Sequence, residues 1–84
     1  MTTKTLAAEV EEARIIVDSA HAVFYGTVNE RSLSWALGNM AGLRALSAKV
    51  RASGTPAQRR TVARLTKAMA KVVAGINARL ARRA

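Results

Sequence analysis

The chain has 84 residues and no cysteine, and its fourteen Lys and Arg residues against five Asp and Glu residues give a net charge of +9. This length suits one domain rather than two independent cores, so we predict a single helical domain over residues 1–84. The absence of cysteine excludes disulfide scaffolds, thiolate zinc sites and cysteine nucleophiles. With only one Phe, one Tyr and one Trp, the core must consist of aliphatic residues and alanine, which favour helices over sheets.

The first predicted helix spans about residues 5–25. Its apolar residues alternate at spacings of four and three, which is typical of a helix in a bundle. They are Leu6, Val10, Ala13, Val17, Ala20 and Phe24. The start of the chain does not resemble a signal peptide, since Glu9, Glu11 and Glu12 interrupt it, and no apolar run approaches the roughly 20 residues of a membrane span. We therefore expect a cytoplasmic protein without a membrane span.

The second predicted helix spans about residues 30–52, with Thr27 or Asn29 as its N-cap. Its apolar stripe consists of Leu33, Leu37, Met40, Leu43, Leu46 and Val50. Gly38 and Gly42 interrupt this helix four residues apart, at a cost of about 1 kcal/mol each relative to alanine. We expect these glycines to allow close packing of a neighbouring helix; a kink or a docking groove for a partner are the alternatives.

The third predicted helix spans about residues 56–82, and its start is the clearest boundary in the chain. Gly54 ends the second helix, Thr55 caps the third, Pro56 occupies the first turn and Gln58 completes a capping box. Two short connections between three helices predict an all-α, up-down-up three-helix bundle. A helical hairpin with a third helix that dimerises is the alternative.

The third helix carries most of the charge. From residue 55 to residue 84 there are eight basic residues and no acidic residue. At about 100° per residue, Arg64, Lys67, Lys71 and Arg82 all lie within about 40° of Arg60, opposite the apolar residues. Like charges three and four residues apart destabilise a helix, and mixed charges would serve solubility equally well. The pattern therefore favours a polyanionic ligand over a merely solvated face.

Nucleic acid is the predicted ligand, because a row of cations along a helix neutralises phosphates without reading bases. The predicted nucleic-acid-binding residues are Arg59, Arg60, Arg64, Lys67, Lys71, Arg82 and Arg83. Asn77 is the one amide inside this helix that a cap does not use, which argues against base-specific contacts. A helix-turn-helix motif with Gly54 in its turn fits poorly. Val50 would occupy a position of the first helix that requires a small residue, and Arg60 a position of the second helix that requires an apolar residue. An anionic membrane surface is a weaker alternative, because the bundle needs the apolar face of this helix.

The alternative function is that of a protein-binding inhibitor or adaptor that docks on an acidic surface of a larger, nucleic-acid-handling complex. Phe24, Tyr25 and Trp35 near the first turn would anchor such an interface, although filling the core would also explain them. The small, alanine- and arginine-rich composition is similar to that of many bacterial and phage accessory proteins. Pairing of two copies, through the apolar stripe of the first helix, is a further expectation.

Catalytic and metal motifs are not evident in the sequence. His21 has only Asp18 at helical spacing, which makes a poor metal site. Glu9, Glu11 and Glu12 are better explained by the positive end of the helix dipole than by acid–base chemistry. We therefore expect no enzymatic activity, no cofactor and no small-molecule substrate.

Overall fold

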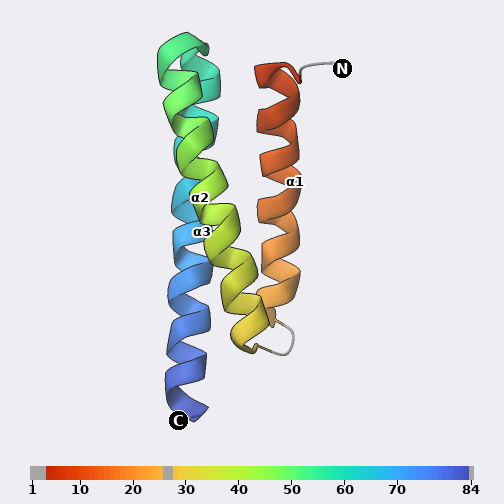
Figure 1. Ribbon diagram of the computed structural model, residues 1–84, viewed down its shortest axis with the longest axis vertical. Coiled ribbons are helices and arrows are strands. Elements are labelled where there is room, and N and C mark those ends of the chain that lie inside the picture. The colour runs from red at the N-terminus through yellow and green to blue at the C-terminus, as the bar shows by residue number, and fades with distance from the viewer. Residues whose placement is uncertain (1–3, 26–27, 84) are drawn as a thin grey trace.

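The computed structural model describes residues 4–25 and 28–83, and it describes side chains for residues 4–20 and 28–82. Three helices form an all-α bundle: α1 (Leu6–Tyr25), α2 (Glu30–Ser53) and α3 (Pro56–Arg83). The predicted bounds are confirmed to within one residue. Helices α1 and α3 run in the same direction and α2 runs opposite to both (Figure 1). The three helices pack within one chain, so a hairpin completed by a second copy is not needed to form the core.

Side-chain caps define where α2 and α3 begin. At α2 the cap is Asn29, whose side chain accepts a hydrogen bond from the Ser32 amide at 3.0 Å. At α3 the Thr55 hydroxyl accepts from the Gln58 amide at 3.1 Å, and the Gln58 side chain accepts from the Thr55 amide at 2.9 Å. Each pair satisfies amides that the first helical turn leaves without partners. The predicted capping box of α3 is confirmed, and Asn29 caps α2; Thr27 lies outside the described residues.

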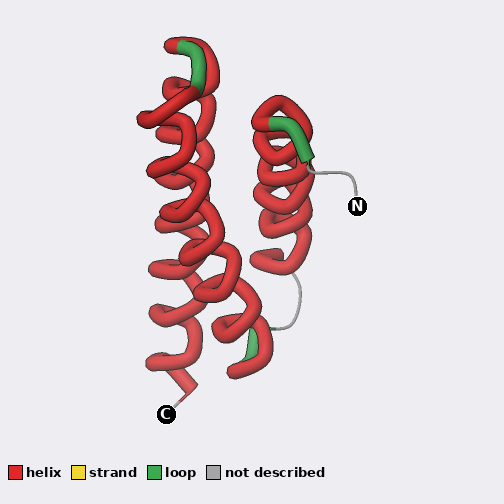
Figure 2. The backbone as a smooth tube through the Cα atoms, turned by 45° about the horizontal axis from the view of Figure 1, so that its top comes forward, coloured by secondary structure: helices red, strands yellow, loops and turns green. Residues whose placement is uncertain are grey.

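The connection between α2 and α3 consists of Gly54 and Thr55 alone (Figure 2). The Gly54 amide donates to the Val50 carbonyl at 2.9 Å with an extended backbone (φ −89°, ψ 168°). A Cβ atom at this residue would lie 2.7 Å from the Val50 oxygen. Glycine is required here because the chain turns back against the end of α2.

The core lies between the three helices and is entirely aliphatic. Its residues are Ala13, Val17, Ala20, Val28, Ala36, Leu43, Leu46, Val50, Val62, Leu65, Met69, Val72 and Ile76. Leu6 and Val10 are half-buried against its edge, so the described part of the predicted α1 stripe packs within the bundle; the Phe24 side chain lies outside the described residues. Because this stripe is occupied, pairing of copies would need a different surface.

The predicted apolar stripe of α2 is wrong at one residue, Leu37. Leu37 is 50% exposed, and its neighbour Ala36 is fully buried instead. Consecutive residues point about 100° apart on a helix, so only one of the two can face the core. The small side chain of Ala36 occupies the core-facing position. The spacing of four residues from Leu33 to Leu37 therefore does not identify the buried face in this part of α2.

The prediction that Gly38 and Gly42 allow close packing of a neighbouring helix is also wrong. A Cβ atom added to either glycine would meet nothing within 4 Å, and both residues are exposed. The helices of the bundle therefore make no use of the missing side chains. The glycines instead leave an open surface on α2.

Candidate nucleic-acid interface

The candidate site is the outer face of α3. Burial of Val62, Leu65, Met69, Val72 and Ile76 turns this helix so that the opposite side faces solvent. Four consecutive cations of that side are exposed: Arg60, Arg64, Lys67 and Lys71, which we call the cationic row. At 1.5 Å per residue they are separated by about 6, 4.5 and 6 Å along the helix axis. The core therefore presents these four charges in one line.

The other predicted site residues lie apart from the row. Arg59 is exposed, and its Nη1 donates to the Gly54 carbonyl at 3.2 Å, which ties it to the α2–α3 connection. Arg82 is exposed eleven residues beyond Lys71, about 16 Å along the axis. Exposed Ala74 and Ala78 occupy the same face in between. Arg83 ends α3, and its side chain is not described. The charge is thus most concentrated between residues 60 and 71.

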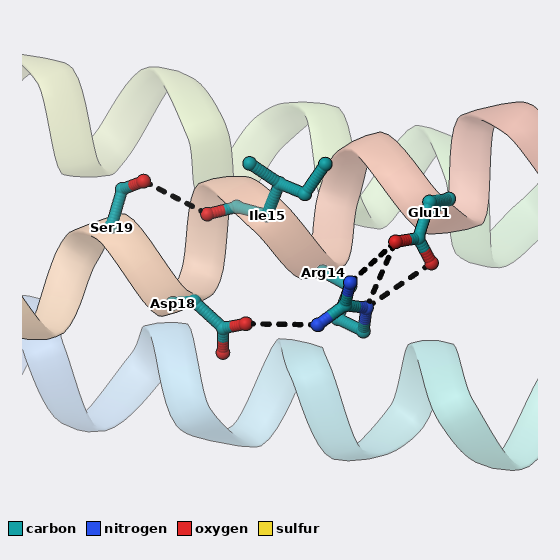
Figure 3. Close-up of polar contacts among 5 residues, drawn as sticks. All are labelled: Glu11, Arg14, Ile15, Asp18 and Ser19. Atoms are coloured by element: carbon teal, nitrogen blue, oxygen red, sulfur yellow. Dashed lines mark hydrogen bonds and ion pairs between the residues drawn. The ribbon is translucent and has the colours of Figure 1, made fainter.

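Four of the five Asp and Glu residues lie on α1, and the fifth, Glu30, is the first residue of α2. Arg14 bonds both Glu11 and Asp18, with 3.1 Å between its Nη1 and an Asp18 oxygen (Figure 3). The hydrogen bond from Arg14 lowers the pKa of Glu11 and raises that of Arg14. Four of the five carboxylates take part in ion pairs, and each of these pairs has its cation outside α3.

Two further ion pairs complete this arrangement. Lys4 lies 2.9 Å from Glu12, and the hydrogen bond between them raises the pKa of Lys4. Lys49 of α2 lies 2.8 Å from Glu9 of α1. Each acidic residue of α1 therefore forms an ion pair with a cation of the N-terminal segment, α1 or α2.

Within the described residues, the cationic row has no carboxylate partner. None of its four side chains takes part in an ion pair or a side-chain hydrogen bond. Neighbouring members are three or four residues apart, so they repel one another along the helix. The row is an unneutralised line of positive charge that a polyanion can satisfy.

The alternative aromatic anchor is only partly visible. Trp35 lies in the second turn of α2 and is 37% exposed. The side chains of Phe24 and Tyr25, the other two predicted anchor residues, lie outside the described part of the chain. Ile15 and Leu37 are also exposed, on α1 and α2.

The sequence reasoning missed a groove between α1 and α2. It has a volume of about 210 Å³ and is bordered by the Glu9–Lys49 ion pair. Its lining residues are Glu9, Glu12, Ala13, Ile16, Asn39, Gly42, Leu43, Ala45, Leu46 and Lys49. The exposed glycine and alanine residues of α2 were the available signal, but their meaning depends on where α1 lies.

Other kinds of site find no support in the described part of the chain. It contains no group of three His, Cys, Asp or Glu residues placed to hold a metal ion. The His21 side chain lies outside the description. Among residues 4–25 and 28–83, none of the helices combines the length and apolar character needed to cross a bilayer.

Comparison with known protein families, with curated proteins and with solved structures found no match to this chain.

Proposed function

We propose that this protein binds nucleic acid through phosphate contacts made by Arg60, Arg64, Lys67 and Lys71. The observation that carries the proposal is the absence of a carboxylate partner for these four exposed cations, when the carboxylates of α1 are already paired with Lys4, Arg14 and Lys49. Cations that line one helix face release counterions when they meet phosphates, which supplies affinity independent of sequence. Arg59, Arg82 and Arg83 extend the contact towards the two ends of α3.

The proposed binding does not discriminate between base sequences. The Gln58 side-chain oxygen is occupied by the Thr55 amide, so this amide serves the cap. Asn77 is exposed but lies about 100° around the helix from Arg60. No amide on the cationic row is thus available for the paired hydrogen bonds that read adenine. Contact with phosphates of either strand is what remains, and we propose a cytoplasmic location for this activity, where such polymers are accessible.

Fluorescence anisotropy with labelled random-sequence DNA, as duplex and as single strand, tests the proposal. The four contacts of the cationic row contribute about −3.6 to the slope of log affinity against log salt for B-DNA, at about 0.9 per contact, and contacts by Arg59, Arg82 and Arg83 add to it. The double variant Lys67→Glu/Lys71→Glu should lose most of the affinity, and the loss of two contacts should make the slope shallower by about 1.8.

The matched control is Arg44→Glu/Arg51→Glu, which removes the same charge from exposed positions of α2. The proposal requires this control to bind much more tightly than the α3 variant. Equal losses in both would mean that net charge, rather than the row, attracts the DNA. No binding by the unaltered protein at low salt would refute the proposal.

An acidic protein surface is the second candidate partner. This candidate is favoured because the protein is basic and also exposes Trp35, an aromatic side chain that could anchor an interface. In that case the protein would be an inhibitor or adaptor of a larger complex, of the kind that phages encode. The double variant Arg60→Lys/Arg64→Lys distinguishes the two candidates. Binding to nucleic acid should persist, because phosphates accept lysine in place of arginine. Binding to an acidic protein surface should weaken, because the paired hydrogen bonds from arginine to carboxylates would be lost.

A further inference from the structure

The α1–α2 groove and the exposed side of α2 form one continuous surface. Six exposed residues follow one another on α2 at spacings of four and three, which places them on one side of the helix. They are Arg31, Trp35, Gly38, Gly42, Ala45 and Lys49, which we call the α2 seam. The last three of them line the groove, and the first three continue beyond it.

The seam has a projection at one end and a recess at the other. Trp35 is the projection, a large exposed aromatic side chain in the first half of α2. The recess is the groove of about 210 Å³ beside Gly42, Ala45 and Lys49, with Ala13, Ile16 and Leu46 among the residues that line it. Trp35 is not among the residues that line the groove of its own chain, and it lies about 15 Å from Ala45 along the helix.

A two-fold axis near Met40 brings projection and recess together. In an antiparallel pair of α2 helices centred there, Gly38 of each copy meets Gly42 of the other. Trp35 then reaches the level of the partner's Ala45, inside the groove. Because neither glycine has a neighbour within 4 Å of an added Cβ in its own chain, the two backbones can approach closely.

Charge complementarity supports the same pairing. Arg31 is exposed and has no carboxylate partner within the described residues. In the antiparallel pair it arrives at the level of the partner's Lys49, where Glu9 and Glu12 of α1 line the groove. Glu9 is already paired with Lys49 and Glu12 with Lys4, but the four carboxylates of α1 share only three cations, so Arg31 of the partner offsets the remaining negative charge.

We propose that two copies of this chain form a symmetric dimer in which Trp35 of each copy enters the α1–α2 groove of the other. Each groove is incomplete without the aromatic side chain that the partner contributes. No residue of α3 lines the groove, so the dimer is independent of the proposed nucleic-acid contact and leaves both cationic rows uncovered.

Sedimentation equilibrium of the full chain, from low micromolar to millimolar concentration, is the first test. The mass should rise from 9.0 kDa to that of a dimer and no further. Trp35 is the only tryptophan, so its emission should shift to shorter wavelength over the same range. A monomer at every concentration, or growth beyond a dimer, would overturn the proposal.

Two sets of variants locate the interface. Gly42→Gln has room in the monomer but blocks close approach, so it should weaken dimerisation by about tenfold or more while the helical circular dichroism stays unchanged. Ala48→Gln, at an exposed position of α2 off the seam, is the matched control and should dimerise normally. Equal dimerisation of both variants would place the interface elsewhere. Arg31→Glu should weaken the dimer and Arg31→Glu/Glu12→Arg should restore it; failure of the restoration refutes the proposed register.

Discussion

Replacing Lys67 with glutamate should make the protein more stable and a poorer binder of nucleic acid. Lys67 is exposed, three residues after Arg64 and four before Lys71, and it has no carboxylate partner within the described residues. Each such like-charge pair costs about 0.2–0.5 kcal/mol, and each opposite-charge pair contributes a similar amount. Reversing the charge changes both pairs from repulsive to attractive, which adds about 0.8–2 kcal/mol to the free energy of unfolding.

Urea denaturation followed by circular dichroism measures this difference. Lys67→Gln is the matched control, because it removes the two repulsions without adding attractions and should stabilise the fold by about 0.4–1 kcal/mol. Both gains should shrink near 1 M salt, where the Debye length falls to about 3 Å. Affinity for DNA should decrease in the order unaltered protein, Lys67→Gln, Lys67→Glu.

The reasoning fails if Lys67→Glu is neutral or destabilising at low salt, because the row would then contain no unrelieved repulsion. It fails equally if the variant gains stability and still binds DNA with unaltered affinity and salt dependence. A gain in stability together with a loss of binding is the trade-off that marks a surface kept for a ligand.

Three further predictions concern the fold. At dilutions where the protein is monomeric, Gly42→Ala should stabilise the fold by about 1 kcal/mol and Gly54→Ala should destabilise it by about 1–3 kcal/mol. The effects differ because a Cβ atom at residue 54 meets backbone atoms, whereas one at residue 42 meets nothing within 4 Å. Thermal unfolding of the two variants measures both changes in stability. Met69→Ala should cost about 2–5 kcal/mol, a large share of the roughly 4–13 kcal/mol expected for this length, and chemical denaturation would show it. The contact with Arg14 lowers the pKa of Glu11, so this contact stabilises the fold at pH values above 4.5, the ordinary pKa of the group. The stabilisation is lost as the pH falls through the lowered pKa. In Arg14→Gln, an NMR titration should find that the pKa of Glu11 has returned towards 4.5.

The two proposed surfaces divide the molecule between them. The cationic row lies on α3, and the groove is lined only by α1 and α2. A dimer through the groove would carry two cationic rows, so one assembly could contact two stretches of nucleic acid. Variants of Gly42 and of Lys67 therefore separate association of copies from binding of phosphate.

Much of the fold could be predicted from the sequence because the decisive signals are local. The start of α3 follows from Thr55 and Gln58, three residues apart, whose reciprocal hydrogen bonds need no other part of the chain. The exposure of the cationic row follows from the 3.6-residue period of one helix, which sets Arg64 and Lys67 opposite Met69. Interactions within one helical turn determine both features.

Only the tertiary structure decided what each side of α2 faces. The inward position of Ala36, the exposure of Leu37 and the open space beside Gly42 depend on where α1 and α3 lie. The ion pair between Lys49 and Glu9 joins residues forty positions apart, and the groove beside it has no counterpart in the spacing of either helix. A helix period shows that a side is apolar or small, but the packing of distant segments determines whether that side is covered.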